Sequence, residues 1–148
     1  MRVAIALLIA ATLSGARIAG QAAADDLARL QGVWTVTAAE QNGKPFDAIK
    51  GGVLTIADST FFLRTAAGNE LKGDLRINSA ASPRQLDFVH ADGRTVWEAI
   101  YTVSDEVLRL NYIEAGGRDK RPTLFATNAN GPGTVIVMRR TASLAPSK

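Results

Sequence analysis

Side chains able to perform acid–base chemistry are scarce in this 148-residue sequence. Its single histidine, His90, lies three positions after Asp87, and side chains three apart in a strand point to opposite faces. These two groups therefore do not form a pair within one strand, and we expect a solvated histidine at a strand end. The adjacent acids Asp105 and Glu106 fall in a predicted turn, where we expect solvated carboxylates.

Motifs that mark enzymes and metal sites are missing from the sequence. It has no cysteine, H-x-x-x-H pair, calcium loop, G-x-S-x-G motif or phosphate-binding glycine loop. We therefore predict a protein that is not an enzyme, and we expect neither a cofactor nor a metal. An esterase or isomerase would have to rely on His90, the only conventional base at neutral pH.

Aromatic side chains form the one constellation that is typical of a small-molecule site. In an open barrel they would line an apolar cavity, with tyrosine hydroxyls to orient a ligand. In a filled barrel the same side chains would be plain core. The candidates are Phe88, Trp97, Tyr101, Tyr112 and Phe125.

Basic residues in a later loop could attract the anionic head group of such a ligand. Arg118, Lys120 and Arg121 lie close together there, although a run of charge is often simply solvated. Arg121 is the best candidate of the three, because Pro122 restricts the chain beside it. We therefore place Arg121 at the mouth of a site for a small apolar or amphipathic ligand.

The first 24 residues have the organisation of a signal peptide. Arg2 precedes the apolar residues 3–13, and Ala22-Ala23-Ala24 offers a cleavage site before Asp25. Ala16 ends a second possible site. Because the apolar run is shorter than the about 20 residues that cross a bilayer, we expect export to the periplasm or medium without a stable membrane span. An uncleaved anchor is the alternative.

The remaining chain has the length of one domain, which we place at residues 25–141, with a disordered tail at 142–148. Cleavage after Ala24 would lower the formal net charge from +3 to about +1. Such a domain lacks the clustered basic excess of nucleic-acid-binding proteins. Without cysteine it has no disulfide framework, so its core must hold it together.

Alternation of apolar and polar residues predicts short strands that would position these side chains. In residues 32–40 it directs Trp34, Val36 and Ala38 to one face, after a polar helical turn at 25–30. The predicted fold is all-β, a small antiparallel up-and-down barrel of about eight strands, which can enclose one small ligand. The further expected strands are 53–57, 60–65, 70–78, 84–90, 94–103, 107–113 and 134–140, with a possible short strand at 123–127.

Several short motifs, in order, resemble a family of lipocalin-like bacterial domains found in predicted secreted or surface proteins. The matching pieces are Leu30-Gln31-Gly32-x-Trp34, Glu40-x-Asn42-Gly43, Pro83-Arg84-x-Leu86-Asp87, Ile100-Tyr101, Leu108-x-Leu110, Arg121-Pro122-x-x-Phe125 and Arg140. The chain departs from this family at Ala99, where glycine is more frequent, and at Asn111, where cysteine is common. The resemblance implies the barrel fold, and the family itself has no established function.

The wider likeness to lipocalins concerns the closed end of the barrel. In lipocalins a Gly-x-Trp tryptophan closes the base, and an arginine from the last strand lies across its ring, a favourable cation–π contact. Strand register leaves Arg139 and Arg140 both possible, and the resemblance favours Arg140. We expect Gly32, Trp34 and Arg140 to form this structural plug. If the barrel is solid, the protein is instead a structural or protein-interaction module of unknown partner.

Overall fold

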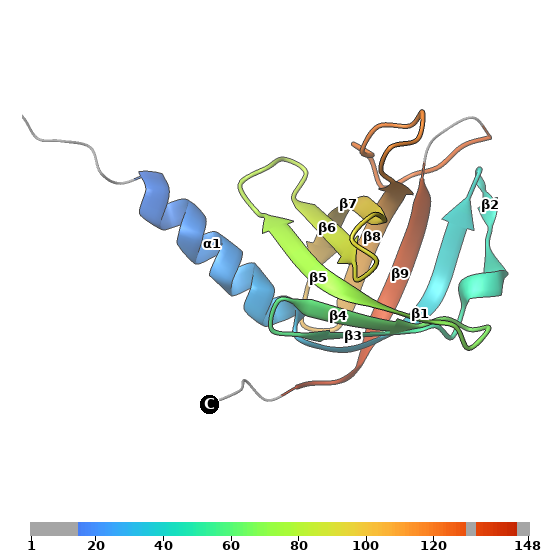
Figure 1. Cartoon of the computed structure of the whole chain (residues 1–148), viewed down its shortest axis with the longest axis horizontal. Coiled ribbons are helices and arrows are strands. Elements are labelled where there is room, and N and C mark those ends of the chain that lie inside the picture. The colour runs from blue at the N-terminus through green and yellow to red at the C-terminus, as the bar shows by residue number, and fades with distance from the viewer. Residues whose placement is uncertain (1–14, 130–132, 145–148) are drawn as a thin grey trace, which may run out of the picture.

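The computed structural model describes residues 15–129 and 133–144, which form a closed antiparallel barrel with one helix at its end (Figure 1). β1 pairs with β3 on one side and with β9 on the other, which closes the sheet. In chain order the elements are α1 (Gly15–Leu30), β1 (Gly32–Gln41), β2 (Lys44–Pro45), the 3-10 helix η1 (Asp47–Ile49), β3 (Val53–Ala57), β4 (Thr60–Arg64), β5 (Glu70–Asn78), β6 (Gln85–His90), β7 (Val96–Val103), β8 (Val107–Glu114) and β9 (Thr134–Ala142).

The predicted all-β, up-and-down architecture is confirmed. Each barrel strand pairs with the next along the chain, and the two-residue β2 only extends the edge of β1. Within the described residues, eight strands close the barrel once β2 is set aside. The possible strand at 123–127 is wrong, because these residues cross the outside of the barrel as irregular chain.

Strand ends differ from the predictions where side chains bond to the backbone. β7 begins at Val96 rather than at Arg94, because the Asp92 carboxylate accepts hydrogen bonds from the Thr95 hydroxyl and from the N–H groups of Thr95 and Arg94. The bond from the Thr95 hydroxyl, followed by those from the two N–H groups, lowers the pKa of Asp92 to about 2. β9 continues to Ala142, one residue into the expected tail.

Register irregularities bend the wall without breaking it. A bulge between Val36 and Ala38 on β1 brings Ala39 into the core and leaves Ala38, expected inside, exposed. On β5, a Cβ atom at Gly73 would lie 1.9 Å from the carbonyl oxygen of Val89. Only glycine therefore allows β5 to pass this close to β6, as a tightly curved barrel requires.

The floor of the barrel lies under the C-terminal end of α1. Trp34 is fully buried there, and its indole N–H donates to the carbonyl of Leu30 at 2.8 Å. The guanidinium carbon of Arg140, directly opposite on β9, is 4.1 Å from the centroid of the Trp34 ring. A Cβ on Gly32, whose φ is +134°, would lie 2.6 Å from Arg140 Nη1, so glycine is required here.

The arginine also binds the end of the helix. Arg140 donates to the carbonyls of Arg29 and Gln31, and through Nε to that of Asp105 in the turn between β7 and β8. The last carbonyls of a helix have no partner inside it, and the negative end of the helix dipole favours a cation. One side chain thus joins α1, β1, the β7–β8 turn and β9.

Helix α1 is longer than the predicted turn at 25–30, because the alanines read as a cleavage pattern also favour helix. Its barrel-facing end is fixed by Asp26, which is 5% exposed. The Asp26 carboxylate accepts hydrogen bonds from the Tyr101 hydroxyl at 2.6 Å and from Arg84 at 3.1 Å. Residues 1–14 of the expected signal peptide lie outside the described residues. Among the residues that the structure does describe, no helix is long and apolar enough to cross a membrane.

Removing the floor tryptophan should be costly. We expect Trp34→Ala to lower the free energy of unfolding by roughly 3–5 kcal/mol, because it leaves a large cavity under Arg140. Chemical denaturation would measure this loss. Trp97→Ala, the same change at a half-buried position, should cost less, and equal losses for the two variants would contradict the special role of the floor.

Both tyrosines of the sequence should resist ionisation in the folded protein. Burial raises the pKa of Tyr101, and the Asp26 carboxylate raises it further; burial also raises the pKa of Tyr112, against a smaller opposite effect of Thr134. A folded-state pKa above the unfolded value adds stability that is complete below pH 10 and is lost as the pH rises beyond it. Tyrosinate absorbance should therefore appear only with alkaline unfolding; ionisation near pH 10 in a still-folded barrel would contradict this.

Candidate functional site

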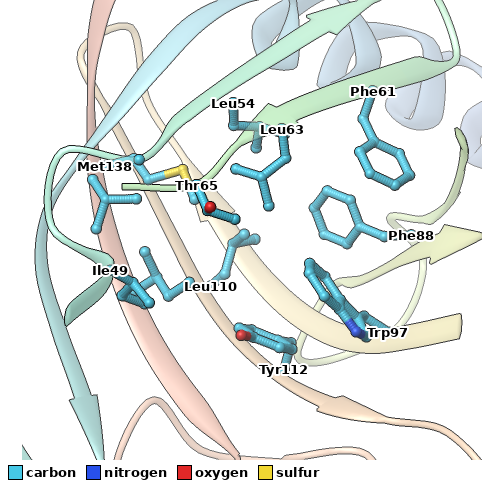
Figure 2. A pocket seen from close by; sticks show the side chains of 13 residues that line it. Ile49, Leu54, Phe61, Leu63, Thr65, Phe88, Trp97, Leu110, Tyr112 and Met138 are labelled. Carbon is cyan, nitrogen blue, oxygen red and sulfur yellow. The ribbon is translucent and has the colours of Figure 1, made fainter. Parts of the chain in front are cut away.

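A cavity of about 90 Å³ lies inside the barrel, away from the floor (Figure 2). Inward-facing side chains of β1, β3, β4 and β6–β9 line it, and Ile49 of η1 adds to its wall. The lining residues are Val36, Ile49, Gly52, Leu54, Phe61, Leu63, Thr65, Phe88, Trp97, Leu110, Tyr112, Ile136 and Met138.

The chemistry of this wall is almost wholly apolar. Among the lining side chains, only Thr65, Trp97 and Tyr112 carry an oxygen or nitrogen atom. The rings of Trp97 and Tyr112 have centroids 4.9 Å apart and planes inclined by 31°. A hydrogen bond links Tyr112 to Thr134, so the cavity offers an incoming molecule little beyond apolar contact.

A second, larger hollow adjoins the cavity, and we call it the polar depression. It measures about 580 Å³ and shares Trp97 and Tyr112 with the cavity wall. Its other lining residues are mainly polar or glycine: Gln41, Asn42, Ile113, Glu114, Gly117, Asp119, Gly133 and Thr134. Small-molecule sites commonly occupy about 300–1,000 Å³, a range that the depression reaches and the cavity alone does not.

Three of the predicted site residues are brought together by the structure. Phe88 and Trp97 are opposite one another on β6 and β7, and Tyr112 follows on β8. All three line the cavity. The alternation that predicted inward side chains on these strands placed them correctly.

Tyr101, expected in the same wall, does not line the cavity. It faces inward but lies four residues beyond Trp97 on β7, about 13 Å along a strand. That distance takes it to the floor, where its hydroxyl binds Asp26. The expectation was wrong because alternation predicts the face of a strand but not the height within the barrel.

Arg121, expected at the mouth, lies on the outer wall. Its guanidinium contacts Asp87 Oδ1 at 2.6 Å and Glu98 Oε1 at 3.7 Å, and donates to the Ala99 carbonyl at 2.9 Å. Asp87 and Glu98 are direct neighbours on β6 and β7, where two like charges would repel. Arg121 offsets this repulsion and fixes residues 115–129 to the barrel, so it does not receive a ligand head group in this structure.

Phe125 is also outside the barrel. The guanidinium carbon of Arg109 lies 5.1 Å from the centroid of the Phe125 ring, and Arg109 donates to the Phe125 carbonyl at 2.7 Å. The Asn111 amide donates to the neighbouring carbonyl of Leu124. The segment 115–129 is therefore a strap over the outer face of β8, and its aromatic ring does not belong to the interior.

His90 is buried rather than solvated. It is 7% exposed, because it continues the inward alternation of Leu86 and Phe88 on β6. Its ring is 4.4 Å from that of Trp97 and 5.5 Å from that of Phe61. Its Nε2 atom has no hydrogen-bond partner in the described part of the chain.

Several lining residues were not singled out from the sequence as a site. The alternation does place Leu54, Leu63 and Leu110 inward, but nothing local separates a residue beside a cavity from one in solid core. Ile49 lies in η1 and not in a strand, so the alternation of apolar and polar residues could not place it in the barrel wall. Within residues 15–129 and 133–144, no three His, Asp or Glu side chains are grouped so that they could hold a metal ion.

No protein-family model, no curated protein and no solved structure matches this chain.

Proposed function

We propose that this chain is an exported, non-enzymatic binding protein that holds the apolar part of a small molecule inside its barrel. The observation that carries the proposal is the apolar cavity between the floor and η1. A well-formed apolar hollow with a few polar groups at one side is the usual form of a small-molecule site. The cavity size limits the inserted part to a short chain or a slender group.

The position of His90 supports a role without catalysis. General bases act through a hydrogen bond to the reacting group, directly or through one water. The imidazole of His90 instead packs edge-on against Trp97 and Phe61, and it is absent from the residues lining the cavity and the depression. A substrate in either hollow would not meet it.

The contacts of α1 are compatible with cleavage after Ala24. Residues 20–25 are mostly exposed, whereas Asp26 and Leu30 are buried against the barrel. A chain that begins at Asp25 would therefore keep the bonds of Asp26 to Tyr101 and Arg84. Export and processing would leave the folded domain intact.

A second candidate is the interaction module with a solid barrel. It is favoured by the small volume of the cavity and by the dense packing of the floor, where Leu30, Ile56 and Leu108 are fully buried. In that case the half-buried side chains around Leu63 would fill the cavity in solution. The outer surface of the barrel would then bind a protein partner.

Cavity binding can be followed through one side chain. Met138 lines the cavity, and the sequence contains only one other methionine, Met1. We expect 1-hexanol to shift the NMR signal of a ¹³C-labelled Met138 methyl group. Leu63→Phe should fill the half-buried side of the cavity and exclude about two methylene groups, at ~0.8 kcal/mol each, which weakens binding roughly tenfold.

The matched control is Leu124→Phe, the same change on the strap, where Leu124 is 70% exposed. This variant should bind hexanol like the unaltered protein. Thermal melting of both variants would show that each is folded. An unmoved Met138 signal at millimolar hexanol in the unaltered protein would favour the solid barrel.

Export has its own test. The full sequence, expressed in a Gram-negative bacterium, should yield a periplasmic protein whose intact mass corresponds to residues 25–148. Cleavage after Ala16 would give a larger product with a longer α1. Recovery of uncleaved chain in the membrane fraction would support an anchor and contradict the proposal.

A further inference from the structure

The second hollow beside the cavity restricts the head group of the ligand. We propose that the site takes a small amphiphile whose short apolar end enters the cavity and whose head, a protonated or methylated amine, lies in the polar depression. This inference rests on the proposed function, and it adds the charge and orientation of the ligand.

The cavity and the polar depression share part of their walls. Trp97 and Tyr112 line both, so a molecule that occupies both hollows lies along these two rings. The apolar space is about 90 Å³ and the polar space about 580 Å³. The depression therefore has room for a head group larger than the apolar end that the cavity admits.

The charged residues that line the depression, among those that the structure describes, are both acidic. Glu114 and Asp119 are its charged lining residues, and neither forms an ion pair with another described residue. Arg121, which we expected at the mouth of the site, instead pairs with Asp87 and Glu98 on the outer wall. A cation in the depression gains from these carboxylates, whereas an anion is repelled.

The aromatic pair at the junction favours the same ligand charge. The face of an aromatic ring carries negative electrostatic potential and attracts ammonium groups, and pockets for methylated amines are commonly built from such rings. Trp97 and Tyr112 lie against each other, and Trp97 also contacts His90, so a head group meets only the ring surface that these contacts leave free. The carboxylates thus select the charge of the head group, and the rings add contact with its apolar part.

Three probes of equal chain length test the proposal on the full chain: n-hexylamine, 1-hexanol and hexanoate at pH 7. Dissociation constants come from the shift of the ¹³C-labelled Met138 methyl signal. Hexylamine should bind roughly threefold or more tightly than hexanoate, because exposed charge pairs contribute modestly. Raising the salt concentration should reduce this ratio, since mobile ions screen exposed charges.

A double variant locates the effect. Glu114→Gln combined with Asp119→Asn should bring the ratio of the hexylamine and hexanoate constants close to one. The matched control, Asp105→Asn combined with Glu106→Gln, removes the same charge at the β7–β8 turn beside the floor. The control should keep the ratio of the unaltered protein.

The binding constants of the three probes separate this inference from the proposed function. Hexanoate binding as tightly as hexylamine, or a ratio that the double variant leaves unchanged, would overturn this inference while hexanol binding still supports the proposed function. Preference for hexanoate would instead assign the head group to the exposed Arg118 and Lys120, which flank Asp119 in the sequence. Failure of hexanol and hexylamine alike to shift Met138 would overturn both proposals.

Discussion

The contact between Arg140 and Trp34 is the interaction on which the rest of this barrel depends. An eight-stranded sheet closes only if its first and last strands meet, and these two residues face each other across that seam. The arginine also occupies the free carbonyls at the end of α1 and the turn after β7, so helix, seam and turn are fixed by one group. Because a guanidinium carries five donors and stays charged, lysine could not replace it. The backbone of Gly32 allows that group to pass close by.

Closing one end firmly leaves the other end free to hold a cavity. Around the floor the interior is filled by Trp34, Leu30 and Tyr101, and the buried Asp26 carboxylate is satisfied by two donors. Further up, the wall residues Leu63 and Tyr112 are only partly buried, and the space between facing side chains is not filled. The unfilled cavity loses dispersion contacts between side chains, and the well-packed floor offsets that loss. The densest packing and the open space therefore lie at opposite ends of one sheet.

Much of this architecture could be predicted from the sequence, and most of the failures concern positions that depend on residues far apart in the chain. Alternation in 70–78 and 107–113 identifies strands and their inner faces, because each residue reports its own side of the sheet. It cannot tell that Tyr101 lies near the floor and Trp97 near the cavity, since height depends on the tilt and stagger of all strands. Arg121 and Phe125 were misplaced for a related reason: their positions depend on contacts with Asp87 and Arg109, which lie far from them in the chain. The burial of His90 was missed although its alternation indicated it.

The position of Arg121 bears on the charge around the polar depression. A basic loop near the open end suggests an anion site when only the sequence is considered. In the folded chain Arg121 pairs with Asp87 and Glu98 on the outer wall, and the residues of this loop that line the depression are Gly117 and Asp119. The sign of the charge around a site thus follows from which charges the fold has already neutralised, and not from the composition of the nearest segment. Loop positions vary more readily than strands, so Gly117 and Asp119 can alter the charge of the depression while Arg121 keeps its contacts with β6 and β7.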